Sequence, residues 1–157
     1  MKIYVGGDHA GFGLKEQVIN FLTELGHEVV DKGAFEYNET DDYPDFVIPV
    51  AREVSFHPNE VRGIVIGGSG QGEAIAANKF KYVRAALYYG PATSLVQDPV
   101  SIIKLSREHN NANILSLGAR FIGEDEMKSA VKEWLDTPFT NEERHVRRIN
   151  KVDHLHE

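Results

Sequence analysis

The chain of 157 residues contains no cysteine, and its formal net charge is −7. Without cysteine it can form neither a disulfide nor a catalytic thiolate, which fits a reducing compartment. The acidic balance argues against general nucleic-acid binding, which depends on a basic footprint. No apolar run approaches the roughly 20 residues of a membrane span, and the strand-like start has no apolar signal-peptide core. We therefore expect a cytoplasmic protein with no nucleic-acid or membrane partner.

The composition is otherwise typical of one globular domain, which we expect to span residues 1–157. A hydrophobic content of 41% and a charged content of 26% suit a chain that buries its own core. The basic residues are uneven, because "ERHVRRINK" gathers several of them in a helix predicted from about residue 141 onward. Such a cationic cluster on an acidic protein suits a small anionic ligand.

Five short apolar runs alternate with helical patterns along the chain. The runs are "KIYVGG", "HEVVDKG", "RGIVIGG", "VRAALYY" and "ANILSLGA". Nearly continuous apolar strands form parallel sheets that are covered on both faces. The pattern predicts an α/β fold: a three-layer α/β/α, Rossmann-like domain with a five-stranded parallel sheet. Pro49 predicts that the helix within residues 42–54 starts late or kinks, and Pro99 predicts a loop before a helix from about Val100 to Glu108.

Glycine-containing segments follow three of the predicted strands. They are "GGDHAG" after the first, "GGSGQGEA" after the third and "GAR" after the fifth. Ligands of parallel sheets bind beyond the carboxyl ends of the strands, so we expect all three segments on one rim. In the first segment Asp8 and His9 could be acid, base or ligand, or simply polar surface residues. The third segment contributes Arg120.

The loop "GGSGQGEA" fits neither of two standard phosphate-binding motifs. A P-loop would continue with lysine after Gly72, and a dinucleotide fingerprint would have a third glycine where Glu73 stands. Glycines at 68, 70 and 72 still let several N–H groups converge at a helix start. That point could hold a phosphate or an oxyanion formed during a reaction. Beside an oxyanion Glu73 would be a natural general base; alternatively, it only favours the first helical turn.

Further candidate residues lie in the second half of the chain. His109 and Asn110 end a predicted helix, where the helix dipole alone favours histidine. Arg144 and Arg148 are four residues apart and face the same way, which suits a phosphate or a solvated helix face. The terminal "HLHE" is too weak a pattern to predict a metal site.

The motifs together resemble the ribose-5-phosphate isomerase B family, which includes galactose-6-phosphate and allose-6-phosphate isomerases. The matching segments are "GGDHAGFGLK", "TDDYPDF", "GSGQGEAIAANKF", "VRAA", "LSREHNNANILSLGAR" and "RHVRRI". The resemblance implies that the chain interconverts an aldose phosphate and a ketose phosphate through an enediolate, without metal or cofactor. Many members use a cysteine where Gly67 stands here; another branch uses a glutamate, which Glu73 matches.

The resemblance also implies a role for each candidate residue. Glu73 would be the base, Ser69 would position the substrate beside it, and His109 would assist opening of the sugar ring. The remaining residues would bind the sugar or its phosphate: Asp8, His9, Tyr43, Gly68, Gly70, Gly72, Asn110, Arg120, Arg144 and Arg148. Backbone dipoles lower the pKa of a carboxylate such as Glu73 whereas burial raises it, and the sequence leaves the outcome open.

Family members are dimers or larger, and the segment equivalent to His109–Arg120 reaches into the neighbouring subunit's site. We therefore expect a homodimer, or a tetramer, with active sites shared between subunits. Ribose 5-phosphate is the expected substrate. Residues 88–104 form a longer segment than in other members, so a six-carbon sugar phosphate stays an alternative. A non-catalytic module that binds a sugar phosphate is the alternative from another functional class.

Overall fold

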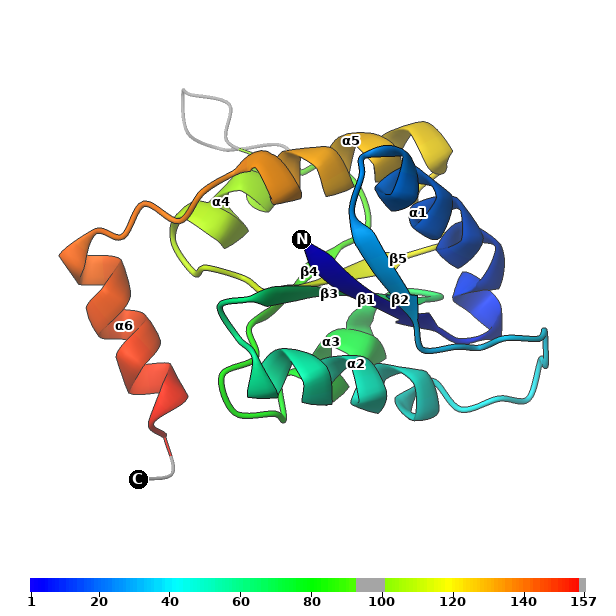
Figure 1. Ribbon diagram of the computed structural model, residues 1–157, viewed down its shortest axis with the longest axis horizontal. Coiled ribbons are helices and arrows are strands. Elements are labelled where there is room, and N and C mark those ends of the chain that lie inside the picture. Colours follow the sequence, from blue (N-terminus) through cyan, green and yellow to red (C-terminus); the bar gives the residue numbers. More distant parts are fainter. Residues whose placement is uncertain (93–100, 156–157) are drawn as a thin grey trace.

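The computed structural model describes residues 1–92 and 101–155, and within these residues five strands form one parallel sheet (Figure 1). The strands lie in the order β2-β1-β3-β5-β4, and every neighbouring pair is parallel. Their bounds are β1 Lys2–Gly7, β2 Glu28–Asp31, β3 Val61–Gly67, β4 Ala85–Tyr88 and β5 Ile114–Gly118. The predicted five-stranded parallel sheet is confirmed.

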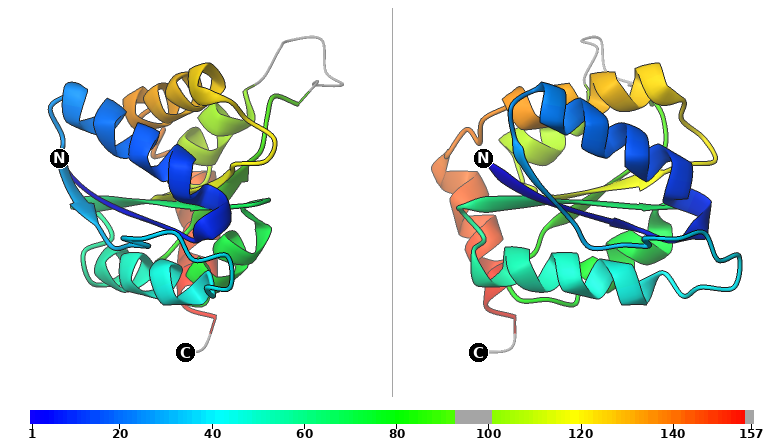
Figure 2. Two further views of the ribbon diagram at one scale, coloured as in Figure 1. Left: turned by 90° about the vertical axis from the view of Figure 1, so that its right-hand side faces the viewer. Right: turned by 45° about the vertical axis from the view of Figure 1, so that its right-hand side comes forward.

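Helices cover both faces of the sheet, which gives the three predicted layers (Figures 1 and 2). One face carries α1 (Phe12–Glu24), α4 (Ile102–Glu108) and α5 (Glu124–Asp136). The other face carries α2 (Pro44–Phe56) and α3 (Gln71–Ala77). A short 3₁₀ turn, η1 (His9–Gly11), joins β1 to α1. The last helix, α6 (Glu143–Asp153), stands apart from these layers at the edge where the strands begin.

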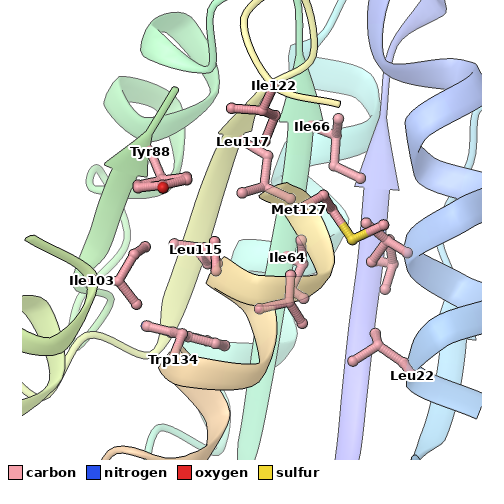
Figure 3. Packing of buried hydrophobic residues seen from close by; sticks show 14 of the residues in the cluster. Leu22, Ile64, Ile66, Tyr88, Ile103, Leu115, Leu117, Ile122, Met127 and Trp134 are labelled. Atoms are coloured by element: carbon pink, nitrogen blue, oxygen red, sulfur yellow. The ribbon is translucent and has the colours of Figure 1, made fainter. Parts of the chain in front are cut away.

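The core explains why the strands read as continuous apolar runs. Between the sheet and helices α1, α4 and α5, the side chains of Ile64, Leu115, Met127 and Trp134 are fully buried (Figure 3). A second cluster lies under α2 and α3 on the opposite face. Since both faces are covered, both sets of alternating side chains are mostly apolar, and the apolar runs follow.

Helix α2 begins at Pro44 and runs through Pro49 to Phe56, so the predicted late start is wrong. Pro44 occupies the first turn, where its missing N–H would be unpaired in any case. A proline inside a helix costs about 3 kcal/mol. The fully buried side chains of Val47, Val50 and Val54 each contribute roughly 1.5–3 kcal/mol. Their burial offsets the backbone bond that Pro49 cannot make.

Helix α4 begins at Ile102, two residues after the predicted start at Val100. Ser101 caps it, because its hydroxyl accepts a hydrogen bond from the backbone N–H of Lys104 at 3.2 Å. Pro99 and residues 93–100 of the longer segment lie outside the described residues. Among the helices that are described, none combines the length and apolar composition needed to cross a membrane. The cytoplasmic location and the single unit 1–157 stay predictions.

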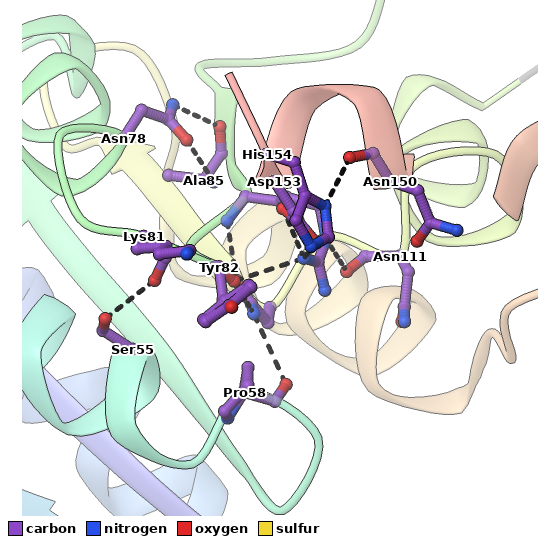
Figure 4. A network of polar contacts seen from close by, with 12 residues as sticks. Ser55, Pro58, Asn78, Lys81, Tyr82, Ala85, Asn111, Asn150, Asp153 and His154 are labelled. Atoms are coloured by element: carbon purple, nitrogen blue, oxygen red, sulfur yellow. Dashed lines mark hydrogen bonds and ion pairs between the residues drawn. The ribbon is translucent and has the colours of Figure 1, made fainter. Parts of the chain in front are cut away.

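Helix α6 is fastened to the body of the chain by one arginine. Arg84 pairs with the carboxylate of Asp153 at 3.1 Å and also donates to the carbonyl oxygens of Tyr82 and Asn111 (Figure 4). Upstream of α6, the hydroxyl of Thr140 donates to the carbonyl oxygen of Glu108 at 2.8 Å. The Arg84–Asp153 pair holds the end of α6 beside the start of β4, and the Thr140–Glu108 contact holds the segment before α6 beside the end of α4.

Candidate active site

The three glycine-containing segments meet on one rim, as predicted. Gly7 at the end of β1 pairs with Ile66, and Gly67 at the end of β3 pairs with Gly118 of β5. Beyond the strands, the backbone N–H of Arg120 donates to the carbonyl oxygen of Gly68 at 3.1 Å. The sheet therefore places the ends of β1, β3 and β5 next to one another.

The glycine loop is packed so closely that Gly67, Gly70 and Gly72 have no room for a side chain. Gly70 has φ +74°, and an added Cβ would lie 2.8 Å from a side-chain carbon of Leu87. At Gly72 an added Cβ would lie 2.9 Å from Cζ of Tyr43, so the tyrosine ring rests on the loop. The hydroxyl of Ser69 accepts the backbone N–H of Gln71 at 3.3 Å. Tyr43 thus borders the loop to which Ser69 belongs.

Glu73 is buried, with only 4% of its surface exposed, so it is not merely a solvated first-turn acid. Its carboxyl group lies against Gly67 and fills the space in which a side chain at position 67 would begin. Burial raises the pKa of Glu73, and the nearby charge of Asp8 raises it further, against a lowering by the residue's own backbone N–H. Burial therefore outweighs the backbone dipoles, which suits a base that works near neutral pH.

Substituting Gly67→Ala is expected to lower kcat by about 10²-fold, because displacing a reacting group by 1 Å can have that effect. The added methyl group would overlap with the Glu73 carboxyl group and push it away. KM should change little, since the other groups of the rim keep their places. Steady-state kinetics measure both constants. Gly13→Ala is the matched control, because a Cβ there meets nothing within 4 Å; an unchanged kcat in Gly67→Ala would contradict the expectation.

His9 is held by Asp41, a residue that the sequence analysis did not single out. The ring Nδ1 of His9 lies 2.6 Å from Oδ1 of Asp41, and the backbone N–H of His9 donates to both carboxylate oxygens at 3.1 Å. This hydrogen bond is the main reason why the pKa of His9 is raised. Asp41 lies within the motif "TDDYPDF", but only the structure shows that the loop after β2 returns to the end of β1.

Arg120 lies beside the glycine loop, and its charge also reaches His9. The Arg120 guanidinium is exposed and lies so close to Gly68 that an added Cβ there would be 3.0 Å from its Cζ. The charge of Arg120 also acts on His9 and lowers its pKa, although less than Asp41 raises it. Arg120, together with His9 when it is protonated, favours an anion on this rim.

Asp8, His9 and Asp41 bring metal-ligand types of atom within 4.8 Å of one another. The Asp41 carboxylate is already used to hold His9, and Oδ1 of Asp8 accepts the backbone N–H groups of Ala10 and Gly11 at 3.0 and 3.1 Å. Asp41 therefore fixes its loop to His9, and Asp8 stabilises η1. We assign no metal to them.

Binding of the phosphorylated substrate is expected to weaken as the pH rises, and in Asp41→Asn this loss should begin at a lower pH than in the parent chain. A raised pKa keeps His9 positively charged to higher pH, and KM should rise once pH passes that pKa. Without the carboxylate the rise should begin at lower pH and reach about two- to five-fold, the range for solvent-exposed charge pairs. KM measured across pH tests this, with the exposed neighbour change Asp42→Asn as control. Identical profiles for the parent chain and Asp41→Asn would contradict the role of Asp41.

The other predicted residues lie at the opposite edge of the sheet. His109 ends α4 and stacks on His145 of α6, with ring centroids 4.3 Å apart. Asn110 and Arg148 line a cavity of ≈ 420 Å³ beside β4, and Arg144 pairs with Glu142 at 2.7 Å. At about 3.3 Å per residue, the five residues of β5 alone separate the two edges by roughly 16 Å.

One chain thus contains two half-sites rather than one pocket. The carboxyl-edge half holds Asp8, His9, Tyr43, the glycine loop, Glu73 and Arg120; the amino-edge half holds His109, Asn110, Arg144 and Arg148. The predicted phosphate-binding arginines are not brought together within a chain, because Arg120 stays beside its own glycine loop. Of the segment from His109 to Arg120, only the first part belongs to the amino edge.

Comparison with known proteins identifies close relatives along almost the whole chain. Residues 3–152 match the family model described as Ribose/Galactose Isomerase. Ribose-5-phosphate isomerase B of Mycolicibacterium paratuberculosis is 43% identical over 150 residues, covering 96% of this chain and 88% of the relative. Ribose-5-phosphate isomerase B of Mycoplasma genitalium, solved with bound ribulose-5-phosphate, superposes with a TM-score of 0.88 at 36% identity, covering 98% and 95% of the two chains. Ribose-5-phosphate isomerase B of Clostridium thermocellum superposes with a TM-score of 0.86 at 42% identity, covering 99% of this chain and 97% of the other.

Proposed function

Because this chain belongs to the ribose/galactose isomerase family, we propose that it interconverts ribose 5-phosphate and ribulose 5-phosphate. The observation that carries the proposal is Glu73, a buried carboxylate of raised pKa beside a loop of backbone N–H groups. Isomerisation requires a base that moves one proton between neighbouring carbons. It also requires donors for the oxygen that becomes negative. The glycine loop and Glu73 supply both.

The reaction has three steps in this proposal. His109 assists opening of the cyclic sugar phosphate. Glu73 then takes the proton from C2, so that the electrons of the C–H bond form the enediolate, and returns it to C1, while the hydroxyl proton of O2 passes to O1. The N–H groups at the start of α3 donate to the enediolate oxygen, and the Ser69 hydroxyl helps to place the substrate beside the base. His9 and Arg120 bind the phosphate from the carboxyl edge, while Asp8 and Tyr43 line the sugar.

The separated half-sites support a shared active site. His109, Asn110, Arg144 and Arg148 can act on a sugar held beside Glu73 only if a second copy supplies them. A two-fold dimer that sets the amino edge of each chain over the carboxyl edge of the other would complete two equal sites. Helix α6 stands away from the layers of its own chain. Its Arg144 and Arg148 are exposed, so a partner can reach them. We therefore propose a homodimer or a dimer of dimers.

Two alternative functions differ in measurable ways. A six-carbon sugar phosphate would undergo the same proton transfer, and the longer segment at residues 88–104 could change which sugar fits. A binding module without turnover is disfavoured by Glu73, because a carboxylate next to the loop would repel a phosphate bound there.

A substrate panel tests the proposed function. The purified full-length chain is supplied with ribose 5-phosphate, allose 6-phosphate or galactose 6-phosphate, and ketose formation is measured. We expect the highest kcat/KM with ribose 5-phosphate. A higher value with either six-carbon sugar would replace the proposed substrate. Calorimetric binding of all three without any turnover would identify a binding module.

A further inference from the structure

His145 is a buried histidine with an unpartnered ring nitrogen. Its exposed fraction is 3%, and its Nε2 has no hydrogen-bond partner among residues 1–92 and 101–155. The carboxylate of Glu142 is 3.9 Å from that atom, which is too far for a hydrogen bond. A buried polar atom without a partner is costly to the fold. The contacts of the His145 ring therefore suggest a role beyond packing.

The ring of His145 touches the ring of His109. Their planes are inclined by 15° and their centroids are 4.3 Å apart, so the two imidazoles stack face to face. The backbone keeps them together, because Thr140 just before α6 donates to the carbonyl oxygen of Glu108 through both its hydroxyl and its N–H. Stacking uses the faces of the two rings and not the edge that carries the nitrogen atoms of His109.

The surroundings of His145 lower the pKa of its ring and so favour the neutral form. Burial lowers its pKa first, and the charges of His109, Arg144 and Arg148 lower it further, while only Glu142 acts in the opposite direction. A neutral ring can lie against His109 while His109 gains or loses a proton. A permanently charged ring in the same place would repel the protonated form of His109.

We propose that His145 is a positioning residue for ring opening: it fixes the plane of the His109 imidazole so that this ring can exchange a proton with the cyclic sugar. The proposal rests on the proposed function, in which His109 opens the ring. It concerns only that step. The proton transfer by Glu73 takes place on the open chain and does not involve His109.

The two steps can be measured separately. Ribose 5-phosphate is a closed ring and must open before it reacts. Ribulose 5-phosphate carries its phosphate on O5 and cannot close a five-membered ring, so it enters the site already open. Exchange of solvent deuterium into C1 of ribulose 5-phosphate, followed by NMR, therefore reports proton transfer alone. The isomerisation rate from ribose 5-phosphate reports ring opening as well.

His145→Ala is expected to lower kcat from ribose 5-phosphate by about ten- to a hundred-fold, the range for a misplaced catalytic group, and to leave deuterium exchange within about two-fold. His145→Phe should restore most of the lost rate, because its ring can still stack. Lys151→Ala, at an exposed position of α6, is the control and should change neither rate. Thermal unfolding and the mass in solution of each variant are measured alongside.

The outcomes distinguish this proposal from the proposed function. If His145→Ala slows both reactions equally, or neither, the positioning role is overturned. If His145→Ala does not fold, the role is judged on His145→Phe, which must keep at least about a tenth of the parent rate from ribose 5-phosphate; a lower rate overturns it. If the parent chain neither isomerises nor exchanges, the proposed function itself fails, whatever the variants do.

Discussion

Substituting Glu73→Gln is expected to lower kcat by about 10²–10⁴-fold, the usual contribution of a positioned general base. Glutamine has nearly the same shape, so it can occupy the space beside Gly67, but it cannot accept the C2 proton. Binding of ribulose 5-phosphate, measured by calorimetry, should stay within a few-fold of the parent value. Glu16→Gln, which removes an exposed charge on α1, is the matched control.

The same substitution is expected to stabilise the fold at neutral pH. The pKa of Glu73 is raised, so the folded chain holds the proton more tightly than the unfolded chain does. Above the ordinary pKa of glutamate this difference destabilises the parent chain, and Glu73→Gln removes it. The melting temperature should therefore be higher in the variant at pH 7 and should converge with that of the parent as the pH falls.

For the kinetic prediction, a kcat of Glu73→Gln near the parent value would remove Glu73 from the role of base.

Mixing two inactive variants is expected to restore activity. One chain carries Glu73→Gln and the other His109→Asn, so each homodimer lacks one essential group in both sites. In a mixed dimer with shared sites, one site carries both changes and the other carries none. Random pairing of equal amounts should recover about a quarter of the parent activity, since half of the dimers are mixed and half of their sites are intact.

The control for this experiment uses a chain with both substitutions. Mixed with the Glu73→Gln chain, it cannot form an intact site and should give no recovery. Mixed dimers are detected by native mass spectrometry with chains of different tag length. If mixed dimers form but activity does not return, the residues of the two edges do not act in one site, and the shared-site proposal fails.

The sequence predicts the sheet well because a strand that is buried on both faces has apolar residues at successive positions. Runs such as "RGIVIGG" are apolar at successive positions, and the structure confirms the strand within one residue at either end. The shared rim is also predictable, since all parallel strands end on the same side. The bounds of the second strand are predicted less accurately. The strand covers Glu28–Asp31 and not the whole of "HEVVDKG", because the residues that flank it belong to the neighbouring loops.

The details of the candidate site depend on contacts that are remote in the sequence. Asp41 lies 32 residues from His9, and no periodicity reveals that they touch. The direction of the Glu73 pKa shift depends on burial, which the first-turn position does not determine. His145 stands within "RHVRRI", where the arginines suggest a phosphate site and the histidine between them gives no signal of its own.

The carboxyl group of Glu73 and a side chain at position 67 exclude each other, and this restricts how such enzymes can evolve. The resemblance to the family implies that some members carry a cysteine at the position of Gly67. A lineage that acquired that cysteine first would have to displace the carboxyl group of its glutamate base. It could also not lose the glutamate first without losing its base. The two positions must change together or through an impaired ancestor, so the branches should remain distinct over long periods.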